Sequence, residues 1–283
     1  MIEGRPSRTA ERVAVRRAAH QLLDSPRVYD DPLALAILGD AQAAAVRADP
    51  QRSEGGPVAP LLRAFLAVRS RIAEDTLARA VAAGVRQYVI LGAGLDTFAY
   101  RNPSASLRVF EVDYPATQAW KRERLAEARI TVPDNVTYVG VDFATEPLPA
   151  ALEAAGVRAN EPSFFSWLGV TPYLEAENVL ATLAALAPFA MNGGGVVFDY
   201  NTPAASLGPA QRAAFAALSA RVAAAGEPFR GFFEPRALME TLRTMGFREV
   251  RDAGPDELNA TFLADRADGL RVGSVAHILT ALG

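Results

Sequence analysis

The sequence predicts an α/β protein built on a seven-stranded, mostly parallel sheet, with helices on both faces and a helical segment in front of it. After Gly84, short runs rich in β-branched and aromatic residues alternate with helical stretches. Strands that are separated by helices form parallel sheets with right-handed crossovers. The first of these strands runs into a glycine-rich turn at residues 91–97, which is where such sheets commonly place a ligand.

The length of 283 residues suits one large α/β domain or two smaller ones. We expect one integrated domain with two parts. Residues 1–84 form a helical N-terminal lid segment, and residues 85–283 form the core. A helical insert at about 201–233 is expected on the side of the core where a substrate binds.

Composition excludes several kinds of site. The chain has no cysteine and only two histidines, His20 and His277. Disulfides, thiolate nucleophiles and multi-histidine metal sites are therefore excluded, although a carboxylate-rich magnesium site is not. We predict no metal.

Charge and hydropathy point to a cytoplasmic protein that binds neither nucleic acid nor a membrane. The net charge is −3, with acidic and basic residues mixed along the chain. No apolar run reaches the roughly 18 residues that span a bilayer, and the N-terminus lacks the residue order of a signal peptide. These patterns do not distinguish a monomer from a homodimer.

The residues before the sheet predict three helices. Residues 7–23 place apolar side chains on one helical face, and Ser25-Pro26 ends that helix. Asp31 and Pro32 are typical of a helix cap and a first helical position, so a short helix through Leu38 is predicted. Residues 49–57 are polar and rich in turn formers, which favours a mobile loop. An amphipathic helix follows at 59–83.

The remaining elements complete the predicted sheet. Strands are predicted at residues 88–91, 107–112, 135–139, 163–167, 195–200, 248–250 and about 272–279. Helices are predicted at 115–129, 176–190 and 209–225, from Pro235, and at 255–265. The last two strands and the helix between them bring the sheet to seven strands.

The glycine turn alone is compatible with several nucleotides, or with no ligand. Gly92 and Gly94 allow a sharp turn and a close approach to a ligand. A dinucleotide fingerprint needs a third glycine at position 97, where this chain has Thr97. No Gly-Lys-Ser/Thr follows, so a P-loop is not indicated either.

Acidic residues follow the next two strands. Asp113 ends the second strand 21 residues after Gly92, the position at which an α/β nucleotide site holds ribose hydroxyls. Asp113 is also placed to cap the helix that Pro115 begins. Asp142 and Phe143 follow the third strand. Asp142 suits an exocyclic amine and Phe143 a purine face; the alternative is that Asp142 only caps the next turn. Glu111 is expected to be a solvated neighbour.

Five segments of the chain occur in the order and spacing of one family. They are Tyr29-Asp30-Asp31-Pro32-Leu33-Ala34, Val68-Arg69-Ser70-Arg71, residues 91–100, Glu111-Val112-Asp113-Tyr114-Pro115 and Val141-Asp142-Phe143. With them the chain resembles the bacterial S-adenosylmethionine-dependent branch of the leucine carboxyl methyltransferase family. The resemblance implies the class I methyltransferase fold, which is Rossmann-like, and S-adenosylmethionine as cofactor.

The resemblance also implies site residues. The expected cofactor-binding residues are Arg69, Gly92, Ala93, Gly94, Asp96, Asp113, Tyr114, Asp142, Phe143 and Leu168. Within this set the glycines line the methionine moiety, Asp113 holds the ribose diol, and Asp142 and Phe143 flank adenine. Arg69 holds the cofactor carboxylate, which its planar fork matches; a helix-surface salt bridge is the alternative.

One segment departs from the family pattern. Where the family usually has Glu-Gly-Leu, this chain has Leu168-Gly169-Val170. The family glutamate contacts the amino group of the cofactor, whereas Leu168 offers only its backbone carbonyl. The aromatic run around Trp167 suits a pocket wall or core packing.

The implied reaction is O-methylation of a small-molecule carboxyl or hydroxyl group. A carboxylate acceptor needs no general base, and a hydroxyl acceptor does; no catalytic residue is assigned. Candidate pocket residues are His20, Tyr173, Tyr200 and Phe232, with Phe229 and Phe233 nearby. Core packing or a surface position is the alternative for each.

Three other functions remain open from the residues. A protein C-terminal carboxyl group is another acceptor that the family implies. A nicotinamide oxidoreductase is disfavoured by Thr97 and by the lack of a Tyr-x-x-x-Lys relay. A non-catalytic cofactor-binding protein is the third, because Leu168 replaces the family glutamate.

Overall fold

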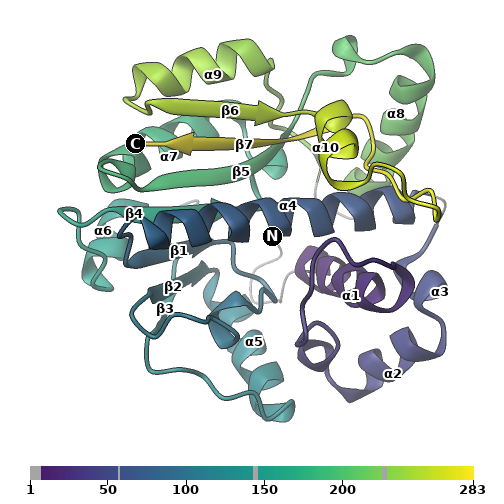
Figure 1. Ribbon diagram of the computed structural model, residues 1–283, viewed down its shortest axis with the longest axis horizontal. Helices are drawn as coiled ribbons and strands as arrows, with labels where there is room; N and C mark the ends of the chain where they lie inside the picture. Colours follow the sequence, from purple (N-terminus) through teal and green to yellow (C-terminus); the bar gives the residue numbers. More distant parts are fainter. Residues whose placement is uncertain (1–7, 57, 143–145, 225–227) are drawn as a thin grey trace.

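The computed structural model of the chain describes residues 8–56, 58–142, 146–224 and 228–283. Its strands are β1 (Gln87–Leu91), β2 (Arg108–Asp113), β3 (Val136–Gly140), β4 (Ser163–Trp167), β5 (Gly195–Asn201), β6 (Glu249–Ala253) and β7 (Ala276–Leu282). They form one seven-stranded sheet in the order β3-β2-β1-β4-β5-β7-β6 (Figure 1). Because only β7 runs antiparallel to its neighbours, the predicted mostly parallel sheet is confirmed.

The strand register brings the site segments to one edge of the sheet. Leu91 at the end of β1 pairs with Val112 of β2, so the glycine turn begins beside Asp113. Ile90 pairs with Ser166 of β4 on the other side. The carboxyl ends of the central parallel strands therefore meet where an open α/β sheet builds its crevice.

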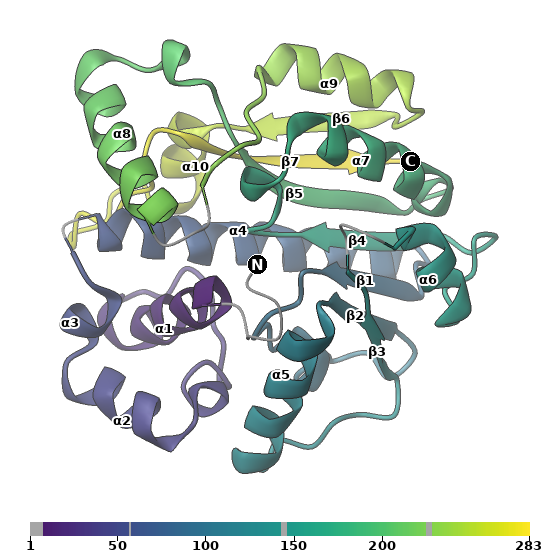
Figure 2. The same cartoon turned by 180° about the vertical axis from the view of Figure 1, so that it is seen from behind.

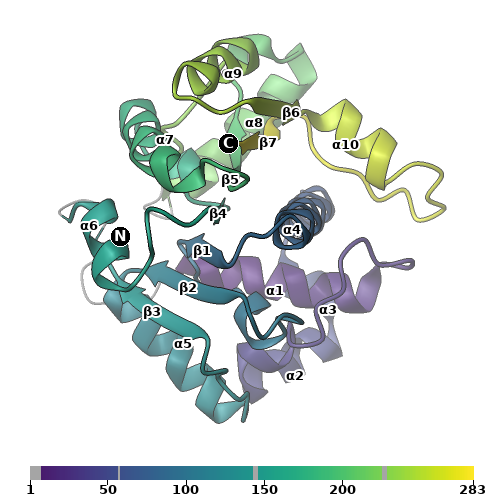
Figure 3. The same cartoon turned by 60° about the vertical axis from the view of Figure 1, so that its left-hand side comes forward.

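Helices cover both faces of the sheet. One core cluster packs α6 (Leu148–Ala154), α7 (Ala176–Ala190) and α9 (Pro235–Thr244) on one face. A second cluster packs α4 (Ala59–Ala82) and α10 (Pro255–Phe262) on the other (Figure 3). Helix α5 (Pro115–Glu127) connects β2 to β3. Strands β1 and β4 are buried along their whole length because both faces are covered.

The N-terminal helices pack beside the carboxyl edge of the sheet. They are α1 (Arg8–Leu23), α2 (Asp40–Ala48) and α3 (Pro50–Glu54), with a 3₁₀ turn at Ala36–Leu38. Their own apolar cluster includes Leu95 of the glycine turn. Helix α8 (Pro209–Ala224) belongs to the insert after β5. Figure 2 shows α8 and α1 on opposite sides of the same end of α4.

Three local predictions differ from the structure. Residues 50–54 form α3 rather than a loop, because the Asp49 side chain accepts a hydrogen bond from the backbone N–H of Arg52 and Pro50 starts the helix. The short helix after Pro32 is a turn followed by 3₁₀ geometry. The last strand begins at Ala276 rather than near Val272.

The glycine turn is followed by a 3₁₀ turn at Phe98–Tyr100 rather than by a full helix. The Asp96 carboxylate accepts from the backbone N–H of Phe98 at 2.7 Å, and Asn102-Pro103 interrupts the chain soon after. Within the described residues, no helix is long and apolar enough to cross a membrane.

Candidate functional site

Two adjoining cavities lie at the carboxyl edge of the sheet. The first, which we call the cofactor-side cavity, has a volume of about 660 Å³ and is lined by the glycine turn and the ends of β2 and β4. The second, the acceptor-side cavity, has a volume of about 770 Å³ and lies between α1, α4, α8 and the end of β5. Residues that line both are Thr9, Val13, Leu66, Arg69, Gly169 and Tyr173.

The glycine turn forms the floor of the cofactor-side cavity. Gly92 and Gly94 have φ angles of +68° and +47°, which side chains rarely tolerate. A Cβ atom at Gly92 would lie 2.4 Å from Val170 Cγ2, and one at Gly94 would lie 3.1 Å from Ala10 Cβ. Glycine is needed at both positions for two reasons. The turn requires positive φ angles, and the loop after β4 and helix α1 pack closely against the turn.

Asp113 stands beside this turn at the end of β2. Its carboxylate accepts hydrogen bonds from the backbone N–H groups of Gly94 at 2.6 Å and Tyr114 at 2.7 Å. It does not cap α5, whose first residues receive no side-chain hydrogen bond at the N-cap. Burial raises the pKa of Asp113, although the two backbone donors oppose that effect. Each carboxylate oxygen keeps a lone pair for a ligand in the cavity.

Arg69 of α4 lies where the two cavities meet. Its Nη1 pairs with Oδ2 of Asp199 at 2.8 Å, and both side chains are buried. The other carboxylate oxygen of Asp199 accepts from the backbone N–H of Gly169 at 2.5 Å. A Cβ atom at Gly169 would come within 2.9 Å of the guanidinium. The pair therefore fixes the Arg69 guanidinium between the loop after β4 and the end of β5, rather than on the surface of the helix.

Most of the expected cofactor residues line the cofactor-side cavity. Those described there are Arg69, Gly92, Ala93, Gly94, Asp96, Asp113, Tyr114, Asp142 and Leu168. Phe143 lies outside the described residues. Trp167 also lines this cavity, although it is fully buried, and its indole N–H has no hydrogen-bond partner among the described residues.

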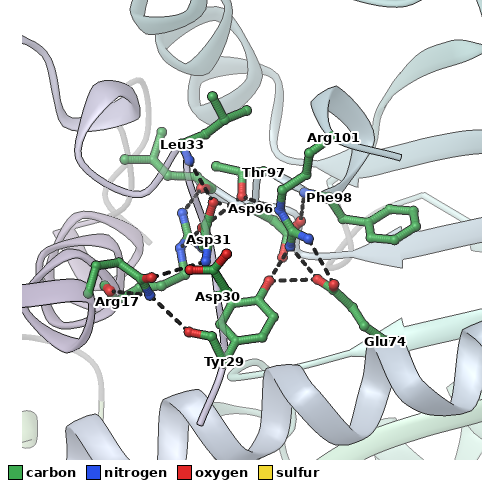
Figure 4. Close-up of polar contacts among 12 residues, drawn as sticks. Arg17, Tyr29, Asp30, Asp31, Leu33, Glu74, Asp96, Thr97, Phe98 and Arg101 are labelled. Carbon is green, nitrogen blue, oxygen red and sulfur yellow. Dashed lines mark hydrogen bonds and ion pairs between the residues drawn. The ribbon is translucent and has the colours of Figure 1, made fainter. Parts of the chain in front are cut away.

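A buried polar network joins the N-terminal segment to the glycine turn (Figure 4). At its centre is Asp31, which is 1% exposed. One carboxylate oxygen accepts from the Thr97 hydroxyl at 2.8 Å and lies 2.8 Å from Arg17 Nε. The other accepts from the Leu33 N–H at 3.0 Å and lies 3.5 Å from Arg101. Thr97, which stands where a dinucleotide fingerprint has glycine, thus fixes this segment in place.

Two further contacts complete this network, which we call the Asp31 network. Arg17 donates to the carbonyl oxygen of Leu95 at 2.5 Å. Arg101 also pairs with Glu74 of α4 and with the Tyr29 hydroxyl. Helices α1 and α4 are thereby tied to the glycine turn by charged groups as well as by packing.

The acceptor-side cavity has aromatic walls. One face of α8 lines it through Gln211, Phe215, Leu218 and Val222, a helical spacing. The rings of Phe215 and Phe229 stack with centroids 5.9 Å apart, and Phe229 lies 5.5 Å from Tyr173. Phe65 of α4 also lines this cavity. These walls suit a flat, largely apolar molecule.

The structure separates the four predicted pocket residues. Tyr173 lines both cavities, whereas His20, Tyr200 and Phe232 are absent from the described lining of either one. The Phe232 ring lies edge-on to that of Phe215, with the ring centroids 6.0 Å apart. Tyr200 is buried on the opposite side of β5 and donates to Asp252 at 2.7 Å.

His20 holds the loop after α1 and is neither a pocket residue nor a surface one. It is buried, and Nδ1 lies 2.6 Å from Asp24 Oδ2. Nε2 accepts from the N–H groups of Val28 and Tyr29, each at 3.2 Å. This pattern places the proton on Nδ1, facing Asp24.

Sequence reasoning missed several residues of the site. Asp199 and Asn201 both line the acceptor-side cavity, and their alternation along β5 is the signal that a strand gives. The spacing of Phe215, Leu218 and Val222 was a second available signal. No pattern in the sequence showed that α1 would line both cavities.

Comparison with known proteins agrees with the sequence resemblance. Residues 10–187 match the family model described as leucine carboxyl methyltransferase. A Bacillus subtilis protein, named as a candidate S-adenosyl-L-methionine-dependent methyltransferase, is 30% identical over 292 residues, which cover 95% of each chain. A Mycobacteroides abscessus protein with the same description is 38% identical over 59% of this chain and 55% of its own.

The fold is shared with a solved structure. The crystal structure of a candidate methyltransferase from Thermobifida fusca superposes with a TM-score of 0.57 at 15% identity, covering 100% of this chain and 97% of the other. The family match and the full-length relative identify the protein as an enzyme that uses S-adenosylmethionine, so the oxidoreductase and non-catalytic alternatives are set aside. The chain belongs to the leucine carboxyl methyltransferase family.

Proposed function

We propose that this enzyme methylates a carboxyl or hydroxyl oxygen of a small molecule. The observation that carries the proposal is the acceptor-side cavity of about 770 Å³, which adjoins the cofactor-side cavity at Arg69, Gly169 and Tyr173. A volume in this range is typical of small-molecule sites. Its aromatic walls favour an apolar or aromatic acceptor over an extended polypeptide end.

The residues of the cofactor-side cavity suit S-adenosylmethionine. Asp113 retains acceptor capacity for the ribose diol, and Asp142 lies further along the same edge for the adenine amine. Arg69 is oriented by Asp199 and supplies a guanidinium edge for the carboxylate of the amino-acid tail. Leu168 supplies a backbone carbonyl where the family pattern leads us to expect glutamate.

Methyl transfer between the cavities requires positioning more than acid–base chemistry. S-adenosylmethionine, when bound, supplies an electrophilic methyl group on a sulfonium. An acceptor oxygen held where the cavities meet would take that methyl group as its oxyanion, so a hydroxyl acceptor would first give its proton to solvent. Alignment of the oxygen and exclusion of water supply most of the acceleration. The shared lining residues are placed to provide both.

The N-terminal segment is placed to act as the lid over both ligands. Ala10 and Arg17 of α1 line the cofactor-side cavity, and Arg12 and Val15 line the acceptor-side cavity. The Asp31 network holds α1 in that position. We propose that the chain forms one domain, in which residues 1–84 are the lid and residues 201–233 are the acceptor-side insert. We expect the enzyme to act in the cytoplasm.

A labelled-methyl screen tests the proposal. Wild-type enzyme is incubated with radiolabelled S-adenosylmethionine and a panel of phenols, aliphatic alcohols and aryl and alkyl carboxylic acids. A parallel reaction contains folded proteins with free C-termini. We expect transfer to one or more small acceptors. Transfer only to protein C-termini would overturn the proposal in favour of protein carboxyl methylation.

A further inference from the structure

The amide of Asn201 is a buried polar group that the protein leaves without a partner. Asn201 is 6% exposed, and its side chain lines the acceptor-side cavity at the end of β5. Among the described residues, Nδ2 has no hydrogen-bond partner. Buried side-chain donors nearly always have one. Because Asn201 lines a ligand cavity, rotation of its terminal amide would let a ligand complete this hydrogen bond.

The backbone of Asn201 is held by its neighbours in the sheet. Its carbonyl oxygen accepts from the Phe233 N–H at 3.0 Å. The residue pairs with Ala276 of β7 in the sheet. The position and orientation of the side chain are therefore set by rigid sheet rather than by a loop.

The position of Asn201 along β5 indicates how far it lies from the junction of the two cavities. Asn201 lies two residues beyond Asp199 on the same face of the strand, because side chains alternate. Two residues of strand span roughly 7 Å. Asp199 marks the place where the cavities meet, through its pair with Arg69. A molecule whose reacting oxygen lies at that junction would carry its second polar group about the length of an aromatic ring away.

We propose that Asn201 is a specificity-determining residue, and that its amide holds a second oxygen of an aryl acceptor across the ring from the oxygen that is methylated. This inference rests on the proposed small-molecule function and deepens it. Phe65, Phe215 and Phe229 supply walls for the ring, and Asn201 supplies its polar anchor. A site built to hydrogen-bond one oxygen discriminates strongly against an analogue that lacks it.

Two matched probes test the inference. 4-Methoxyphenol carries an ether oxygen opposite its phenol, and 4-ethylphenol has nearly the same shape and phenol acidity without that oxygen. Wild-type enzyme is expected to use the first with a kcat/KM at least tenfold higher. Asn201→Leu removes the amide at similar volume and is expected to abolish the preference, mainly by raising KM for 4-methoxyphenol.

Controls separate this role from a structural one. Asn201→Asp keeps the size but loses the donor, and is expected to lose the preference as Asn201→Leu does. Asn160→Leu makes the same amide-to-leucine change at an exposed turn and should retain the preference. S-adenosylhomocysteine affinity, measured by calorimetry, should be unchanged in all three variants, which also reports that they are folded.

The outcomes are distinguishable from failure of the proposed function. Equal use of both probes by the wild type, or a preference that survives in both Asn201 variants, overturns the role of Asn201. Turnover of non-aromatic small molecules alone overturns the aryl class of acceptor. Failure of every small molecule, with transfer to protein C-termini, instead overturns the proposed function.

Discussion

Removal of the charge of Asp31 should destabilise the enzyme far more than the same change at the preceding residue. In Asp31→Asn the shape is kept, but Arg17 loses the carboxylate with which it pairs in the described part of the chain. Arg101 is less affected because it also pairs with Glu74. The variant therefore leaves one buried guanidinium, which is 8% exposed, without a counter-charge.

The size of the effect follows from that single uncompensated charge. Breaking a buried ion pair by removing one partner costs about 3–5 kcal/mol, a large part of the roughly 5–15 kcal/mol by which native proteins are stable. With a urea slope of about 3 kcal/mol/M, the unfolding midpoint should fall by about 1–2 M. Asp30→Asn is the control, because Asp30 and its partner Arg27 have side chains 69% and 50% exposed, and exposed pairs contribute about 0–1 kcal/mol.

Urea titration followed by circular dichroism measures both variants. A second test uses the pair Arg17→Met with Asp31→Asn, in which no charge remains unpaired between the two sites. That double variant should recover part of the loss, with a coupling of about 0.5–3 kcal/mol. The reasoning is refuted if Asp31→Asn and Asp30→Asn unfold at the same midpoint.

Three further predictions concern the two cavities. Asp113→Asn should weaken S-adenosylhomocysteine binding by about ten- to a hundredfold in calorimetry, since hydrogen bonds to a charged group contribute about 1.5–3 kcal/mol. Burial raises the pKa of Asp113. As the solution is acidified, the wild-type affinity for S-adenosylhomocysteine should therefore begin to fall at a higher pH than it would with an ordinary aspartate. An equally steep fall in the Asp113→Asn variant would contradict the role assigned to Asp113. Gly92→Ala should lower both Tm and the affinity for the cofactor, because the φ angle of Gly92 is +68° and the new Cβ atom would lie 2.4 Å from Val170. Adding Val170→Ala should relieve the steric contact but not the backbone strain. Full recovery of Tm in that double variant would show that the φ angle is not limiting. Phe215→Ala should raise KM for an aryl acceptor about tenfold or more, because stacking and burial are lost. The Kd for S-adenosylhomocysteine should stay the same. A change in that Kd would show that Phe215 also affects the cofactor-side cavity.

The sheet was predictable because its central strands are nearly continuous apolar runs bounded by turn residues. All seven strands were predicted, but β6 extends three residues beyond its predicted end and β7 lies three to four residues later than predicted. Helix α3 was not recognised, although Asp49-Pro50 repeats the cap pattern that was noticed at Asp31-Pro32. A short helix stabilised by its cap rather than by an apolar face gives little periodic signal.

The site was less predictable where residues act across long sequence separations. The pair between Arg69 and Asp199 joins positions 130 residues apart, and no local pattern indicates such a contact. Glu111 was expected to be solvated, yet it is buried and pairs with Lys121 at 2.8 Å, because α5 brings a cation to the strand. His20 was misplaced although its partners are nearby in sequence, because the helical pattern does not show that the following loop folds back onto it.

Helices α1 and α8 line the cavities differently, and this difference affects how the range of acceptors of the enzyme can change. Helix α1 lines both cavities and shares Thr9 and Val13 between them, so a substitution at either residue alters cofactor and acceptor binding together. The lining face of α8 contacts only the acceptor-side cavity. Variation at Phe215, Leu218 and Val222 can therefore change which molecule is methylated without loss of the methyl donor. That face is where divergence among relatives, or a directed-evolution library, has the most freedom.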